Sequence, residues 1–299
     1  MSANVYLGAE AIVEALRQGA DLVVTGRVAD PSLFLALLRF EFGWAVDDWD
    51  RLGAGILVGH LLECAGQVTG GYFADAPFKE MLHLARLGFP IAEIWQDGRA
   101  VVTKVSGSGG CVTLDTCKEQ LLYEIHDPSA YLTPDCTADF GAVHLEEGGT
   151  DRVQVYGGRG HPRPETLKVT LGVLEGYIGE GEISYGGSTA LRRATLAAEI
   201  VRERLEIVAA KWDELRSDLI GVDSLHGLSR PSASAAPYEI RLCVAGRTRS
   251  RAQAEMIGYT NGPAGGGGAR KYVHPVLGIR SAYVAREEVK LQVLVEEVQ

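Results

Sequence analysis

Apolar residues in the first 130 positions follow two patterns, one spaced as on a helix face and one continuous. Ile12, Val13 and Leu16 recur at helical spacing, which predicts a helix over about residues 9–20. The apolar run Asp21-Leu-Val-Val-Thr25 follows directly and predicts a short buried strand, because continuous runs of this length are typical of parallel sheets. A helix that leads into such a strand favours an α/β domain.

A long helix is predicted over residues 47–68, and it contains several glycines and alanines. Glycine inside a helix costs about 1 kcal/mol relative to alanine, so we expect another helix or a ligand to approach this one closely. A hairpin is predicted from Ile91–Trp95 and Ala100–Thr103, joined across the turn-forming pair Asp97-Gly98. A glycine-rich loop and a helix over about residues 114–125 follow.

The pattern changes near residue 130 to short strands separated by tight turns, with a long helix over about residues 188–215. We therefore expect two parts. Residues 1–130 form an α/β part with a mostly parallel sheet and helices, and residues 131–299 form a mixed α+β part with antiparallel hairpins and a βαβ-like tail. The glycine-dense segment Asn261–Gly268 predicts a flexible connector within that tail, or a lid if a ligand orders it.

The composition is that of a globular protein with an acidic charge balance. Hydrophobic residues make up 46% and charged residues 23%, and the 299-residue chain has a net charge of −10. This charge disfavours nucleic acids and anionic membranes as partners, because no net positive field attracts their phosphates. Five scattered cysteines without C-x-x-C spacing argue against a disulfide framework and a zinc site. With no signal peptide and no membrane-spanning run, we expect a cytoplasmic protein.

The loop between the predicted hairpin and the next helix is a candidate site for an anionic group. Successive glycines let backbone N–H groups converge, and the N-terminus of the following helix carries partial positive charge. The alternative is a tight turn that needs glycines for its geometry alone. The candidate binding residues of this loop are Lys104, Ser106, Gly107, Ser108, Gly109 and Gly110.

His60, Glu63 and Cys64 lie three and four residues apart, which places them on one face of the predicted long helix. A His–Glu pair could move a proton, and Cys64 could act as a nucleophile with His60 as its base. We expect no metal, because one helix supplies too few ligands for a closed site. The alternative is a close-packed helix with a buried cysteine.

Four more residues are candidates for contacts with the substrate. Arg27 and Asp30 follow the first predicted strand, and ligands of open α/β sheets bind at the carboxyl ends of strands. Asp30 is also a candidate catalytic carboxylate, and Tyr72 lies in a glycine-rich hinge after the long helix. Arg159 and His161 form a basic turn that could bind phosphate, although exposed arginines in hairpin loops are usually solvated surface.

Long segments of the chain carry a resemblance to a known family. They occur in order over roughly residues 3 to 215, and they are Thr25-GRVADPSLFL, Phe42-GWAVDDWD, Gly59-HLLECAGQVTGGYFAD, Gly88-FPIAEI, Thr103-KVSGSGG, Glu119-QLLYEIHDPSAYLTPD and Leu167-KV. Together they resemble the acyclic terpene utilisation A family (AtuA-like proteins). The resemblance implies a role associated with bacterial terpene catabolism, in which acyclic chains are degraded as CoA thioesters. It also implies that an α/β segment usual in the family is missing before residue 1.

These observations lead to one main hypothesis and one alternative. The main hypothesis is a catabolic enzyme acting on a carboxylic acid or acyl-CoA thioester, with lyase, hydratase or isomerase chemistry. CoA would then enter as part of the substrate, and no other cofactor is assigned. The alternative is a non-catalytic or half-site subunit that completes its α/β domain with a separately encoded segment or by forming a homo-oligomer.

Overall fold

The computed structural model describes residues 1–208, 211–227, 237–260 and 267–297. Six residues of the connector predicted at Asn261–Gly268 thus lie outside the described residues. The chain divides into two compact units. The large unit comprises Ala3–Thr170 and Ser281–Gln299, and the small unit comprises Met1–Ser2 and Leu171–Arg280. Each unit has its own cluster of buried apolar side chains.

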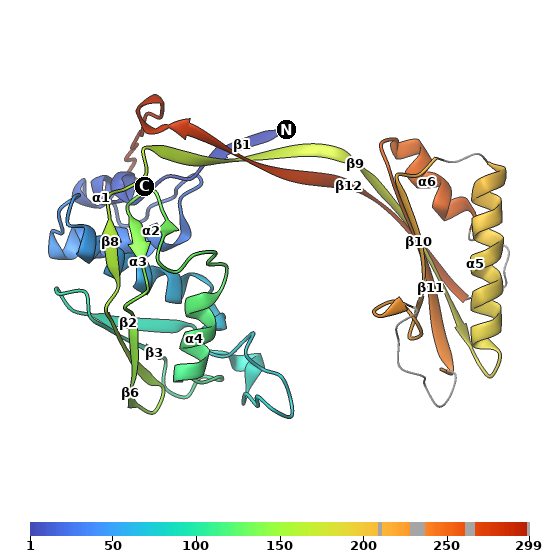
Figure 1. Ribbon diagram of the computed structural model, residues 1–299, viewed down its shortest axis with the longest axis horizontal. Helices are drawn as coiled ribbons and strands as arrows, with labels where there is room; N and C mark the ends of the chain where they lie inside the picture. Colours follow the sequence, from blue (N-terminus) through green and yellow to red (C-terminus); the bar gives the residue numbers. More distant parts are fainter. Residues whose placement is uncertain (209–210, 228–236, 261–266, 298–299) are drawn as a thin grey trace. The chain divides into compact units, whose positions relative to one another are not determined.

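Four α-helices of the large unit surround its core (Figure 1). They are α1 (Glu10–Arg17), α2 (Asp30–Phe42), α3 (Trp49–Glu63) and α4 (Leu114–Leu122). Short 3-10 turns follow α3 at η1 (Ala65–Gln67), precede the first sheet at η2 (Leu84–Arg86) and lie near the C-terminal end at η4 (Arg286–Glu288). Pro31 in the first turn of α2 fits a helix start, and Gly43 ends that helix in the left-handed conformation.

Helix α3 is buried along most of its length, and its glycines explain why. A Cβ at Gly53 would clash with the backbone carbonyl of Arg159, and one at Gly59 would lie 2.6 Å from the carbonyl oxygen of Pro31. The predicted close approach is therefore made by the chain itself. Helix α2 contacts one side of α3, and the strand that contains Arg159 contacts another.

The large unit contains two sheets. The first has the order β2 (Pro90–Ile94), β3 (Ala100–Lys104), β7 (Arg152–Tyr156) and β6 (His144–Gly149). The second has the order β4 (Tyr131–Leu132), β5 (Thr137–Asp139) and β8 (Arg159–His161). The predicted hairpin is confirmed, since Ile94 lies opposite Ala100 and Gly98 adopts a positive φ of 88° in the turn.

The predicted parallel sheet is wrong. The sheets among the described residues are all antiparallel, and parallel pairing is limited to isolated bridges such as that of Leu7 with Val28. The segment Asp21–Thr25, predicted as a buried strand, forms no strand and leaves Leu22 83% and Val24 88% exposed. An apolar run shows that a segment could be buried, but burial also needs a neighbouring strand, and the described residues supply none at this place.

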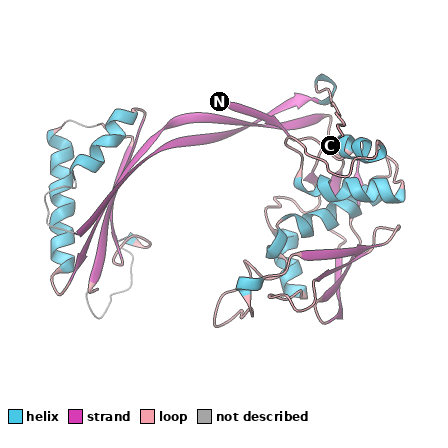
Figure 2. Cartoon of the chain, turned by 180° about the vertical axis from the view of Figure 1, so that it is seen from behind, coloured by secondary structure: helices cyan, strands magenta, loops and turns pink. Residues whose placement is uncertain are grey.

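The small unit is an antiparallel sheet covered on one face by two helices (Figures 1 and 2). The sheet has the order β1 (Ser2–Val5), β9 (Thr166–Gly186), β11 (Glu239–Thr248) and β10 (Glu214–Ile220), and β12 (Gly267–Ala285) also pairs with β9. Most of β1, the first residues of β9 and the last residues of β12 belong to the large unit. Alternate residues of β11, including Ile240 and Leu242, pack beneath α5 (Ala190–Ile207) and α6 (Arg251–Thr260). None of the helices in the described ranges has both the length and the apolar character needed to cross a membrane.

The packing of α3 predicts a strong asymmetry between two glycine substitutions. Gly53→Ala should lower the free energy of unfolding by about 2 kcal/mol, because the added methyl group meets backbone that cannot turn away. Gly26→Ala is the matched control, since a Cβ there meets open space. Chemical denaturation of both variants measures the difference, and equal stabilities would contradict the packing of α3 on Arg159.

Candidate functional site

The C-terminal end of α3 brings three predicted catalytic residues together. His60 and Glu63 lie one helical turn apart, and their side chains meet with 3.0 Å between Nδ1 and Oε1. Cys64 is the residue that ends the helix. The His60 side chain is only 1% exposed, whereas Cys64 is half-buried. The cluster therefore extends from the interior of the unit towards its surface.

Aromatic rings and a glutamine enclose His60. The rings of Tyr131 and Phe140 lie 5.6 and 6.0 Å from the imidazole, measured between ring centres. Gln120 on α4 donates from Nε2 to the backbone carbonyl of His60 at 2.8 Å. These contacts hold the imidazole in place from α4, β4 and the segment after β5.

Several buried polar atoms around this pair have no hydrogen-bond partner among the described residues. They are His60 Nε2, Glu63 Oε2, Gln67 Oε1 and Gln120 Oε1. When Glu63 is ionised it can only accept, so His60 must donate from Nδ1, and in the neutral tautomer that does so the lone pair is on Nε2. The arrangement leaves one imidazole nitrogen and one carboxylate oxygen able to exchange protons.

The electrostatic setting favours the protonated form of Glu63. Burial raises the pKa of Glu63 above its usual 4.5, His60 acts in the opposite direction, and the nearby carboxylates of Asp30 and Glu124 raise it further. Burial also raises the pKa of the Cys64 thiol, an effect that a hydrogen bond with Gln120 partly offsets. At neutral pH Cys64 is therefore a thiol, which suits it less well to act as a nucleophile.

The structure also places Asp30 and Arg27 at this end of the unit. Asp30 begins α2, is 60% exposed and lies close enough to influence the pKa values of Glu63, Cys64 and Tyr131. An oxygen of Asp30 lies 3.7 Å from the Arg27 guanidinium, in an exposed ion pair. Tyr72 is exposed near Tyr123, whose own hydroxyl lies near Cys64. Four predicted catalytic residues thus share one region.

The glycine-rich loop has a different arrangement. Lys104 is buried, its ammonium lying 3.3 Å from an Asp151 oxygen and donating to the Ser108 carbonyl at 3.0 Å. The backbone N–H groups of Ser108, Gly109 and Gly110 donate to the carbonyls of Val105, Arg86 and Leu82. Ser106 and Gly107 are exposed. The anion-binding role of this loop stays a prediction, with most of its donors already engaged inside the protein.

The two residues of the basic turn lie on one strand but have different neighbours. Arg159 and His161 lie on β8, where the Arg159 side chain is exposed and His161 Nε2 lies 3.8 Å from an Asp139 oxygen. Among the described residues, neither of them contacts His60 or Glu63. Their role in binding also stays a prediction.

Potential metal ligands gather in the small unit. Among the described residues, the ligand atoms of Glu180, Glu182 and Cys243 lie within 4.8 Å of one another, on β9 and β11. Burial and neighbouring carboxylates raise the pKa of Cys243 to about 11. Without a metal ion the thiol is therefore protonated at neutral pH, and a metal would have to displace this proton to bind Cys243.

Sequence reasoning missed the residues that enclose His60. Gln120 and Tyr131 come from α4 and β4, about 60 and 70 residues beyond the histidine in the chain. Both lie in the segment Glu119–Asp135, which carries part of the family resemblance. Helical spacing could find His60 with Glu63, but only the tertiary fold brings these partners to them.

The fold and this cluster define a two-unit protein of mixed helices and antiparallel sheets with a buried histidine–carboxylate pair. The family described as "Acyclic terpene utilisation family protein AtuA" matches residues 1–295. The chain therefore belongs to the AtuA family, which confirms the resemblance and implies a role in acyclic terpene utilisation. Comparison with curated proteins and with solved structures gives no significant match.

The raised pKa of Glu63 predicts how stability changes with pH. A glutamate whose pKa is higher in the folded state binds more protons there, so its contribution to stability falls as the pH rises from about 4.5 towards its folded pKa. Glu63→Gln should remove this loss, and at neutral pH it should be at least as stable as the wild type. Urea unfolding across this pH range, with the exposed Glu119→Gln as control, measures the effect. A larger loss of stability at neutral pH in Glu63→Gln than in the control would contradict it.

Proposed function

We propose that the chain is an enzyme of acyclic terpene utilisation that moves a proton on a carboxylic acid or its CoA thioester. The observation that carries the proposal is the His60–Glu63 pair, with an unpartnered imidazole nitrogen and an unpartnered carboxylate oxygen. Membership of the AtuA family supplies the metabolic setting. Proton abstraction next to a thioester carbonyl is a step common to isomerase, hydratase and lyase chemistry.

The pair is suited to this step by its surroundings. Burial raises the pKa of the Glu63 carboxyl group, so this group takes up and returns a proton more readily near neutral pH than a carboxyl group in water. In the proposed step the base takes the α-proton and the electron pair moves onto the carbonyl oxygen. The same group then returns the proton, or a leaving group departs. Arg27 and Asp30 would orient the substrate at the exposed edge of the site.

Exchange of α-protons for deuterium tests this chemistry without knowledge of the final product. A branched acyl-CoA thioester is incubated with the chain in D₂O, and mass spectrometry follows incorporation at the α-carbon. We expect the wild type to accelerate exchange, and Glu63→Gln to lower the rate at least about 100-fold. Cys64→Ser should retain exchange if the cysteine is not the nucleophile.

Glu119→Gln is the matched control, because this glutamate is exposed and forms an ion pair with Lys79. Its exchange rate should equal that of the wild type. Equal rates in Glu63→Gln and the wild type would rule out Glu63 as the acid–base group. No exchange above background with any branched thioester or free acid tested would contradict the proposal as a whole.

A second candidate function is supported by exposed apolar side chains. Leu22 and Val24 are almost fully exposed in the large unit. Leu33, Leu37 and Phe40 recur at helical spacing on α2 and are also exposed, so they form an apolar stripe on that helix. Such surfaces are typical of protein–protein contacts. The chain would then be a subunit completed by a separately encoded α/β segment or by a second copy of itself.

The oligomeric state of the purified chain tests this second function. If the apolar stripe is covered by a second copy, light scattering should give a mass above 32.1 kDa, and Leu37→Glu should return the chain to a monomer. Leu196→Glu, which changes an equally exposed leucine on α5 in the small unit, is the control. A wild type that stays monomeric and binds no separately encoded segment would contradict the half-site function.

A further inference from the structure

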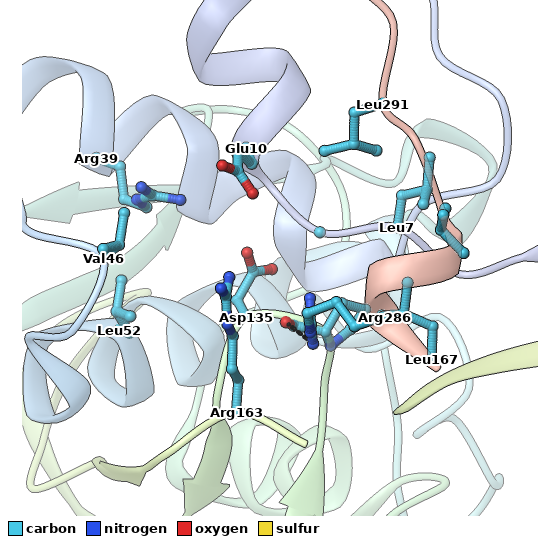
Figure 3. A pocket seen from close by; sticks show the side chains of 13 residues that line it. Leu7, Glu10, Arg39, Val46, Leu52, Asp135, Arg163, Leu167, Arg286 and Leu291 are labelled. Carbon is cyan, nitrogen blue, oxygen red and sulfur yellow. Dashed lines mark hydrogen bonds between the residues drawn. The ribbon is translucent and has the colours of Figure 1, made fainter. Parts of the chain in front are cut away.

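The large unit contains a pocket of about 170 Å³ near the start of α1, the end of α2 and the start of α3 (Figure 3). Its walls come from segments far apart in the sequence, which include Leu7 to Glu10, Arg39 on α2, Asp135, Arg163 and the stretch from Arg286 to Leu291. Figure 3 shows the guanidinium groups of Arg39, Arg163 and Arg286 around the carboxyl group of Asp135. Three cations therefore line one small space.

The protein neutralises these arginines only in part, and they differ in burial, since Arg163 is exposed and Arg286 is half-buried. Arg39 is only 7% exposed, and its Nε has no hydrogen-bond partner among the described residues. Neither Arg39 nor Arg163 forms an ion pair with any residue that the structure describes. Arg286 donates to the carbonyl oxygens of Pro134 at 2.8 Å and Pro164 at 3.1 Å, which carry no full charge. A buried guanidinium without an anion is costly, because burial removes its hydration and nothing replaces it.

Two carboxyl groups also line the pocket, but they do not balance the charge. Asp135 accepts hydrogen bonds from Ala9 N at 2.9 Å and Ser32 Oγ at 2.6 Å, and when ionised it supplies one negative charge beside the arginines. Glu10 is exposed at the rim. With both carboxyl groups ionised, three cations leave one net positive charge. Burial raises the pKa of Asp135, and burial and the neighbouring Arg163 lower that of Arg286. The lowered pKa of Arg286 reflects in part the repulsion between neighbouring cations, which a bound anion would offset, whereas Arg39 and Arg286 act against the effect of burial on Asp135.

Size and lining restrict the anion further. A cavity of about 150 Å³ holds a molecule the size of benzene, so about 170 Å³ accommodates roughly six to eight non-hydrogen atoms. Leu7, Leu52, Leu167 and Leu291 also line the pocket and contribute apolar wall beside the charged groups. A ligand with one negative end and a short apolar chain fits both features. A complete acyl-CoA is far too large.

We propose that this pocket binds a short-chain monocarboxylate, with its carboxylate held by Arg39, Arg163 and Arg286 and its alkyl chain against the leucines. The site goes beyond the proposed function, because it is separate from the His60–Glu63 pair. Leu52 at the pocket and Glu63 are eleven residues apart on α3, which corresponds to about 16 Å along the helix. Guanidinium groups bind carboxylates through paired hydrogen bonds, which gives the site its preference for a carboxylate group.

Isothermal titration calorimetry with 3-methylbutanoate tests the site on the full chain. This probe has one carboxylate and a branched alkyl chain, and we expect it to bind at one site per chain in the micromolar to millimolar range. The neutral 3-methylbutanamide and inorganic phosphate are the comparison ligands. Both should bind at least about tenfold more weakly, the amide because it lacks charge and phosphate because it lacks the apolar part.

Arg39→Met separates loss of binding from loss of folding. Methionine keeps much of the side-chain length and removes an unpaired buried charge, so the variant without ligand should melt no lower than the wild type. Its affinity for 3-methylbutanoate should fall at least about tenfold. Arg192→Met on α5, an exposed arginine of the small unit, should keep wild-type affinity.

Each other outcome overturns a defined part of the proposal. No binding of 3-methylbutanoate by the folded wild type removes the site. Tighter binding of phosphate than of the carboxylate reassigns the pocket to an inorganic anion. Wild-type affinity in Arg39→Met shows that the carboxylate binds elsewhere. Because α-proton exchange is measured with Arg39 intact, failure of this site and failure of the proposed function are distinguishable.

Discussion

The close approach of backbone to helix α3 is the constraint on which the large unit depends. Where most helices keep neighbours at the distance set by their side chains, Gly53 and Gly59 let a strand carbonyl and the start of α2 reach the helix itself. The helix becomes buried from Leu52 to Leu62. As a result, the polar side chains at its C-terminal end are buried. His60 and Glu63 meet there in a low-dielectric interior, where a polar atom without a hydrogen-bond partner is energetically costly.

The same property explains the glycine-rich loop. A Cβ at Gly109 would clash with the backbone of His83, and one at Gly110 with that of Thr69. These glycines are needed because two stretches of chain cross the loop closely. The glycine pattern alone does not distinguish a loop that binds phosphate from a loop that another stretch of chain crosses closely. The hydrogen-bond partners of the loop's backbone N–H groups distinguish the two.

Features that depend on neighbouring residues could be predicted from the sequence, and features that depend on distant ones could not. The hairpin at Asp97-Gly98 and the shared face of His60, Glu63 and Cys64 follow from local geometry. The strand expected at Asp21–Thr25 does not form, because a strand needs a second strand to pair with, and the local sequence does not show whether one lies beside it. The arginines of the pocket stand at positions 39, 163 and 286, and nothing in their spacing connects them. Arg39 alone gives a local signal, as the one cation of α2, a helix that is apolar over most of its length.

The order of the segments along the chain has a consequence for how the chain folds during synthesis on the ribosome. The small unit, Leu171–Arg280, is inserted into the large unit, which resumes only at Ser281. During synthesis the first 170 residues can assemble α1 to α4 and both of their sheets, yet they leave one wall of the arginine pocket open. Arg286 and Leu291 emerge after the whole insertion, and they close that wall last. A nascent chain that stalls within the insertion would therefore hold an incomplete pocket.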